Sequence, residues 1–178
     1  MLYEGGIRSP LIVWGPRYLT KGKSGATNDS SVFAAIDLVP TLMDFAHVPN
    51  AGGITFDGER LCDVLLGQSD RSRAAPLYFR RPPDRPYLPG ERNLPDLALR
   101  EGQWKLLCEY DGTEPQLYNL NTDPGEKKNL AIDHKKEVKR LIGPLLKWNA
   151  SMPTDTGATY TALMKGNGKK RISAAQQH

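Results

Sequence analysis

The residues of this chain that could perform acid–base, nucleophilic or metal chemistry are few and widely separated. The three histidines are scattered along the chain: His47, His134 and His178. Acidic pairs occur at 57/59 and 123/126, each beside a glycine, and helix capping and turn formation explain both. No zinc-protease, serine-hydrolase or phosphate-loop motif is present. The residues alone therefore predict no catalytic group and no metal ligand.

Two cysteines remain as candidate nucleophiles or redox groups. Cys62 and Cys108 each lie among apolar neighbours, which favours two buried thiols, although a disulfide between them stays open at this stage. Neither belongs to a CxxC pair, so a zinc site is not expected.

Four arginines gather in a proline-rich segment. Arg80, Arg81, Arg85 and Arg92 fall in thirteen residues, and guanidinium groups bind sulfate or carboxylate oxygens in a forked geometry. One interpretation is a set of contacts to an anionic substrate or glycan. The other is a solvated loop, because five prolines between residues 80 and 95 exclude a helix or a central strand.

Charge and hydropathy exclude several protein classes. The net charge is +4, of which the last 28 residues supply +3 (four Lys and Arg against one Asp), so the remaining chain is nearly neutral. We therefore expect no nucleic-acid partner, and we expect residues 151–178 to form a disordered basic tail. No apolar run approaches the roughly 20 residues of a membrane span, and no signal-peptide pattern is seen in the first residues.

Local patterns predict the elements that must position these residues. Residues 11–14 read as a buried strand, and residues 37–46 as a helix with Asp37 as N-cap and Pro40 in the first turn. A short helix follows between 57 and 67. Residues 77–79, 97–100, 104–110 and 116–120 then predict an antiparallel meander. The closing helix carries an apolar stripe from Val138 to Trp148 and a kink at Gly143-Pro144.

Six segments, taken in order, resemble conserved blocks of the sulfatase family. They are 3–11 (YEGGIRSPL), 36–42 (IDLVPTL), 57–67 (DGERLCDVLLG), 99–106 (LREGQWKL), 117–120 (LYNL) and 123–130 (DPGEKKNL). The family has matching EGGxRxP, DhhPTL, DGxSL…LxG, RxGxWKh, hLYxL and DPxExxNL patterns. The resemblance covers about five-sixths of the chain and is greatest toward arylsulfatase A and N-acetylgalactosamine-6-sulfatase relatives.

The resemblance implies an α/β fold: the C-terminal part of an alkaline-phosphatase-like sulfatase. Residues 1–67 are then the end of the large domain, and residues 68–150 a small antiparallel sheet with a helix. Glu4 and Arg8 become substrate-proximal candidates, with a structural ion pair as the favoured alternative. Trp104 and Lys105 alternate along a strand, so the indole is expected to be buried on one face while the lysine on the other face stays solvated.

The implied activity is hydrolysis of sulfuric esters, on aryl sulfates or sulfated sugars, with Ca²⁺ and a formylglycine nucleophile in the full-length enzyme. The family places its C/S-x-P-x-R nucleophile motif, its calcium-binding acids and a sulfate-binding lysine before the EGG segment. This chain starts at that segment, and neither cysteine has the required context. We therefore expect a fragment that is inactive alone, whose intact form is periplasmic or secreted. A non-catalytic glycan-binding module and a phosphodiesterase or phosphonate hydrolase of the same superfamily are the alternatives.

Overall fold

The computed structural model describes residues 1–15, 17, 25–81 and 94–153, and divides the chain into two compact units. The first combines residues 1–8 with the chain from Tyr78 onward, and the second comprises residues 9–77. This grouping differs from the expected division after residue 67, because the first eight residues join the small sheet rather than the segment that follows them. The expected basic tail lies outside the described residues from 154 onward.

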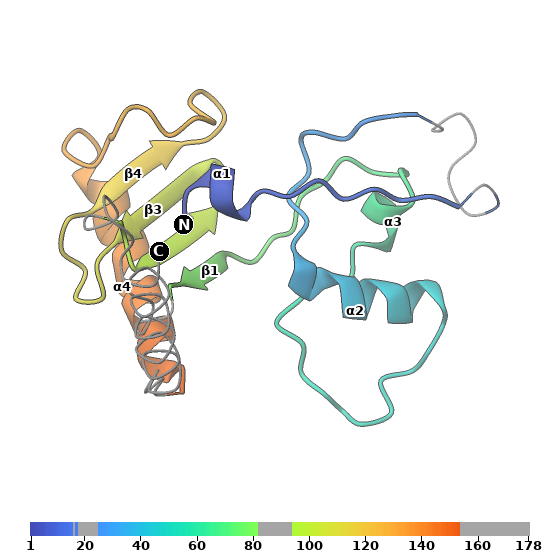
Figure 1. Ribbon diagram of the computed structural model, residues 1–178. Helices are drawn as coiled ribbons and strands as arrows, with labels where there is room; N and C mark the ends of the chain where they lie inside the picture. Colours follow the sequence, from blue (N-terminus) through green and yellow to red (C-terminus); the bar gives the residue numbers. More distant parts are fainter. Residues whose placement is uncertain (16, 18–24, 82–93, 154–178) are drawn as a thin grey trace, which may run out of the picture. The chain divides into compact units, whose positions relative to one another are not determined.

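The first unit contains the expected meander. Strands β1 (Leu77–Arg80), β2 (Leu97–Glu101), β3 (Trp104–Cys108) and β4 (Gln116–Asn119) form one sheet in the order β1-β2-β3-β4 (Figure 1). The β2–β3 and β3–β4 pairs are antiparallel, with Leu106 opposite both Leu99 and Leu117. Gly102 allows the tight β2–β3 turn because its φ is +54°, a conformation that side chains with a Cβ disfavour.

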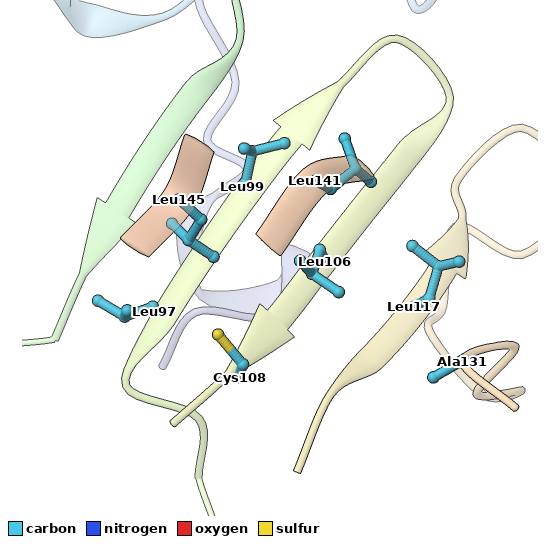
Figure 2. Close-up of a cluster of buried hydrophobic side chains, with 8 residues drawn as sticks. All are labelled: Leu97, Leu99, Leu106, Cys108, Leu117, Ala131, Leu141 and Leu145. Atoms are coloured by element: carbon cyan, nitrogen blue, oxygen red, sulfur yellow. The ribbon is translucent and has the colours of Figure 1, made fainter. Parts of the chain in front are cut away.

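One face of this sheet packs against helix α4 (Lys135–Ser151). Leu141 and Leu145, one helical turn apart, are fully buried against the strands, which confirms the predicted stripe. The helix remains continuous through the Gly143-Pro144 pair. Figure 2 shows the core that the sheet and helix share: Leu97, Leu99, Leu106, Cys108, Leu117, Ala131, Leu141 and Leu145.

The opposite face of the sheet is covered in part by the beginning of the chain. Leu2 packs with Ala98, Leu107, Tyr118 and Leu120, which alternate along the strands with the residues that face α4. The one-turn helix α1 (Glu4–Ile7) follows Leu2 and lies beside the strands (Figure 1). Gly6 is required there, since an added Cβ would stand 2.4 Å from the carbonyl oxygen of Met1.

The second unit is helical and has few buried apolar side chains. It contains α2 (Ala35–Phe45) and α3 (Cys62–Leu65), and its buried hydrophobic residues among those described are Leu61, Val64 and, at its end, Leu77. The predicted strand at 11–14 is not formed: these residues have no regular secondary structure, and Ile12 and Trp14 are 87% and 86% exposed. A strand needs a neighbour to complete its hydrogen bonds, and the described part of this unit supplies none.

The second unit also corrects the predicted start of its first helix. The N-cap is Ala34, and Asp37 is the third residue of α2, where its Oδ2 accepts the Ala34 N–H at 2.8 Å. Pro40 therefore lies in the second turn and has no N–H to donate to the Ile36 carbonyl. The outward side of α2 leaves Ile36, Val39 and Leu42 about half exposed; we call these three residues the exposed apolar face.

Candidate functional site

Glu4, a substrate-proximal candidate, lies in a buried group of charges within the first unit. Its Oε1 is 3.0 Å from Lys105 Nζ and its Oε2 is 3.3 Å from Arg100 Nη1. Lys105 Nζ is also 2.8 Å from Glu126 Oε1, without the alignment of a hydrogen bond. We call Glu4, Arg100, Lys105 and Glu126 the buried ion cluster.

Three of the four side chains of the cluster are almost completely buried, Arg100 reaches solvent, and the charges balance. The Lys105 side chain is 0% exposed, that of Glu126 4% and that of Glu4 7%, and two carboxylates meet two cations. A buried charge is tolerated when it is paired, and here each charged group lies within 3.3 Å of an opposite charge. The arrangement favours the structural interpretation of Glu4 over substrate contact, with Lys105 and Arg100 as its cations in place of Arg8.

The structure contradicts the expectation that the Lys105 side chain is exposed to solvent. The alternation of Trp104 and Lys105 predicted a buried indole opposite a wet lysine, whereas Lys105 is fully buried and Trp104 is half-buried beside α4. The reason is that both sheet faces are covered, and the face beside residues 1–8 supplies two carboxylates for the ammonium group.

A turn after β4 brings Glu126 to this cluster. Asp123 Oδ2 accepts the N–H groups of Lys127 and Lys128, both at 2.8 Å, and so fixes the turn. Glu126 has a φ of +53° and its Oε2 accepts the backbone N–H of Glu4 at 2.6 Å. The segment 123–126 thus connects the start of the chain to the sheet, a role that the sequence alone did not assign to Glu126.

Asn129 completes the attachment of that turn. Its Oδ1 accepts the N–H groups of Leu117 at 3.0 Å and Ala131 at 2.9 Å, as expected of a side chain that binds backbone. Nearby, the hydroxyl groups of Tyr3 and Tyr118 both donate to Gln116 Oε1, at 2.7 and 2.9 Å. Burial raises the pKa of Tyr118 to about 12, so this phenol remains a donor at neutral pH.

The other candidate arginines differ from one another. Arg8 is exposed and makes no ion pair among the described residues. Arg81 is paired with the buried carboxylate of Asp96, and its backbone N–H donates to the Asp96 carbonyl at 2.8 Å. Arg80 donates to the Pro153 carbonyl at 3.4 Å. Arg85 and Arg92 lie outside the described residues.

The second unit contains its own buried polar network, formed by Asp37, Thr41, Glu59 and Arg73. Asp37 is fully buried: Oδ1 accepts the Glu59 N–H at 2.8 Å and lies 3.2 Å from Arg73 Nη1. Thr41 donates its hydroxyl to the Glu59 carbonyl at 3.2 Å and accepts the Leu61 N–H at 3.0 Å. The Asp37 network therefore attaches the 57–61 segment to α2.

Glu59 extends this network through its side chain. Its carboxylate accepts the N–H groups of Ala74 at 3.0 Å and Ala75 at 2.6 Å. Partial burial raises the pKa of Glu59, but these backbone donors and the charges of Arg73 and Arg71 outweigh it, so the net shift is downward. Gly58 is required beside it because an added Cβ would stand 1.9 Å from the Ile36 carbonyl oxygen, the one that Pro40 leaves without its helical donor.

Neither cysteine is placed for nucleophilic chemistry. Both thiols are free, so the disulfide that sequence left open is absent. Cys108 is fully buried, and burial raises its pKa to about 12; Cys62 is partly buried, and its pKa is raised by burial and by the charges of Asp44 and Asp63. Thiolate nucleophiles require a lowered pKa, so both environments suit unreactive thiols.

The histidines and acids provide no further centre in the described part of the chain. His134 is exposed at the start of α4, with its ring centroid 5.2 Å from that of Trp104, and His47 follows α2 with a φ of +52°. His178 lies outside the described residues. Within those residues, no group of three His, Cys, Asp or Glu side chains could hold a metal ion, and no helix is long and apolar enough to cross a membrane.

Comparison with known proteins assigns this chain to a family. The family model "N-sulphoglucosamine sulphohydrolase, C-terminal" matches residues 1–148. Arylsulfatase K of Mus musculus is 31% identical over 142 residues, covering 74% of this chain and 23% of that protein. N-acetylgalactosamine-6-O-sulfatase of Bacteroides thetaiotaomicron is 29% identical over 153 residues, covering 78% and 27%.

A solved structure agrees with this assignment. A Bacteroides thetaiotaomicron protein, described under the metabolism of multiple glycosaminoglycans, superposes with a TM-score of 0.50 at 25% identity and covers 68% of this chain and 26% of that one. The present chain thus spans about a quarter of the length of the relatives it matches. Its order of motifs, its small sheet with a covering helix and the matched region agree: the chain belongs to the sulfatase family and represents its C-terminal region.

Proposed function

We propose that this chain serves a sulfuric ester hydrolase as the scaffold of its C-terminal region, and that it does not hydrolyse sulfate esters alone. The observation that carries this proposal is that residues of the family motifs contact one another. Glu4 and Lys105, from two of them, meet Glu126 from a third inside the buried ion cluster. Residues paired in this way hold a fold together, and none of these three is free to act as an acid or base on a substrate.

The buried carboxylates and the cysteines of the described residues do not fit the calcium and formylglycine that the family resemblance implies. Glu4, Glu126, Asp37 and Asp96 are all paired with Lys or Arg. The two cysteines are free thiols with raised pKa values and lack the expected proline and arginine context. We therefore assign no step through either group to residues of this chain.

The exposed apolar face supports a scaffold within a larger protein. Ile36, Val39 and Leu42 lie on one side of α2 and are about half exposed, and residues 11–14 of the same unit are exposed as well. Contiguous apolar surface of this kind is typical of a face that packs against another part of a protein. In our proposal the partner is the large α/β domain of the sulfatase.

The proposed substrate class is a sulfated sugar. It rests on the names of two similar proteins, one an N-acetylgalactosamine-6-O-sulfatase and the other connected with glycosaminoglycan metabolism. Arg80 and Arg8 make no ion pair among the described residues and stay in the proposal as substrate contacts. Arg85 and Arg92, which lie outside the described residues, stay in it as well.

The test is a comparison of two proteins on 4-nitrophenyl sulfate. The 178-residue chain should show no turnover above a heat-killed control, whether or not calcium is added. A fusion that places the catalytic half of a family member before Met1 should show calcium-dependent turnover. A fusion without its nucleophile is the matched control and should be inactive. Turnover by the bare chain would refute the scaffold proposal, and an inactive but folded fusion would refute the sulfatase assignment of its function.

A further inference from the structure

An open groove lies at the β1 edge of the first unit, apart from both buried polar networks. Its volume is about 640 Å³, inside the range of about 300–1,000 Å³ that is usual for sites of small ligands. It is lined by residues from the start of the chain, from β1 and from the end of α4: Leu2, Tyr78, Phe79, Arg80, Trp148, Met152 and Pro153.

Aromatic side chains form much of this edge groove. Tyr78 and Trp148 are stacked on the α4 side of the sheet, with ring centroids 5.2 Å apart and planes inclined by 17°. Phe79, the next residue along β1, packs on the opposite face of the sheet and lines the other side of the groove. The stacked pair joins the edge strand to α4, so both rings are held before any ligand arrives. A rigid aromatic surface costs little conformational entropy on binding, and it suits the C–H face of a sugar ring.

Among the described residues, one charged side chain lines the groove, and it is a cation. Arg80 has five N–H donors, and among the described residues its hydrogen bond is the long one to the Pro153 carbonyl at 3.4 Å. The neighbouring Arg81 differs because it is paired with Asp96, and Arg140 is paired with Glu101 and Glu137. In the part of the chain that the structure describes, no carboxylate lines the groove to compete for the Arg80 guanidinium.

We propose that the edge groove binds a sulfated sugar residue of a glycan, with its ring against the stacked pair Tyr78 and Trp148 and its sulfate oxygens on Arg80. The proposal rests on the sulfatase function proposed above and adds to it a subsite supplied by this chain. A guanidinium can donate two parallel hydrogen bonds to an oxyanion, which gives the contact both strength and orientation. The apolar remainder of the groove would not attract an anion without Arg80.

The test is a binding measurement that needs no catalysis. The full chain is immobilised at low density, which keeps copies apart, and a defined tetrasaccharide of glucuronate and N-acetylgalactosamine-6-sulfate is passed over it. We expect Arg80→Gln to raise the Kd about tenfold, the effect of losing one charged hydrogen-bonding partner. The desulfated tetrasaccharide should bind more weakly to the native chain and should show no further loss with Arg80→Gln.

Two other variants complete the design. Lys139→Gln removes an exposed positive charge elsewhere on α4 and should leave binding of the sulfated probe unchanged. Trp148→Phe keeps an aromatic ring beside Tyr78 and should weaken both tetrasaccharides to the same extent. The near-ultraviolet circular dichroism of each variant verifies folding, and if Arg80→Gln is misfolded, Arg80→Lys takes its place.

The proposal is overturned if the native chain does not bind the sulfated probe, if Arg80→Gln weakens both probes equally, or if Lys139→Gln weakens binding as much as Arg80→Gln. Each result is distinct from a failure of the proposed function, which is measured by hydrolysis of 4-nitrophenyl sulfate in the fusion. That small ester needs no glycan subsite, so the fusion can be active even if the groove binds no glycan.

Discussion

Removing the Lys105 ammonium group should lower the unfolding free energy of the first unit by more than removing an exposed charge does. In Lys105→Met the side-chain volume is nearly kept, but Glu126 Oε1 loses a cation at 2.8 Å and Glu4 Oε1 loses one at 3.0 Å. Only the contact of Arg100 with Glu4, at 3.3 Å, remains. Two carboxylates that are at most 7% exposed would then share one cation.

The expected cost follows from this geometry. Breaking a buried ion pair by removing one partner costs about 3–5 kcal/mol, because the charge left behind stays desolvated. With a urea dependence of about 2 kcal/mol per molar, the midpoint should fall by roughly 1.5–2.5 M. The double variant Lys105→Met/Glu126→Gln should recover part of the loss, since it removes one of the two uncompensated charges. Lys139→Met, an exposed control, should stay within about 0.5 kcal/mol.

Urea unfolding followed by tryptophan fluorescence measures these differences. Trp104 and Trp148 both pack against the core of the first unit, whereas Trp14 is 86% exposed and should change little on unfolding. The reasoning is refuted if Lys105→Met shifts the midpoint no more than Lys139→Met does. It is also refuted if adding Glu126→Gln makes the loss larger, because the second change would then remove a stabilising group.

Three further predictions concern packing, surface and titration. Gly58→Ala should destabilise the second unit, since its Cβ would stand 1.9 Å from the Ile36 carbonyl oxygen, and hydrogen exchange of the 57–61 amides should accelerate. Val39→Lys should reduce binding of a hydrophobic dye to the isolated chain, which we expect to associate through the exposed apolar face. Cys108, with a pKa near 12, should resist thiol reagents at pH 8 until urea unfolds the sheet, whereas the less buried Cys62 should react earlier. Because folding raises the Cys108 pKa above its ordinary value of 9.0, its contribution to stability is complete below pH 9 and is lost as the pH rises toward 12.

Each of these has a control variant or an outcome that would contradict it. Gly52→Ala places a Cβ no closer than 3.4 Å to its neighbour and should leave the exchange rates unchanged. An isolated chain that stays monomeric and melts sharply without binding dye would contradict the second prediction. Cys108→Ala should flatten the loss of stability between pH 9 and 12, and an unchanged profile would contradict the third.

The meander and the closing helix could be predicted because their patterns are local. Leu141 and Leu145 are one turn apart on α4, and the strands of the sheet follow one another with short turns between them. The run at 11–14 looked equally like a strand, but strand formation depends on a neighbour and not on the run itself. Local sequence therefore predicted the elements whose partners are close in the chain.

The polar networks could not be predicted from local patterns. Their partner residues are far apart in the sequence, or the pattern allows more than one position for the contact. Alternation placed Lys105 on the face opposite Trp104, yet it could not indicate that residues 1–8 cover that face with Glu4. Asp37 was correctly expected to cap α2, but from the wrong position, since an aspartate can accept an end N–H from either the N-cap or the third residue. The resemblance to the family marked these residues as important without giving their contacts.

The attachment of Glu4 to Glu126 has a consequence for the order in which the molecule folds. The two residues are separated by 122 positions, so at ordinary rates of synthesis of about 5–20 residues per second the first waits roughly 6–24 s for the second to emerge. Closing a chain loop of that size costs about 4 kcal/mol in entropy, which delays this contact until the sheet already exists. We therefore expect the opening segment to dock last, so that weakening it accelerates unfolding while leaving the rate of sheet formation almost unchanged.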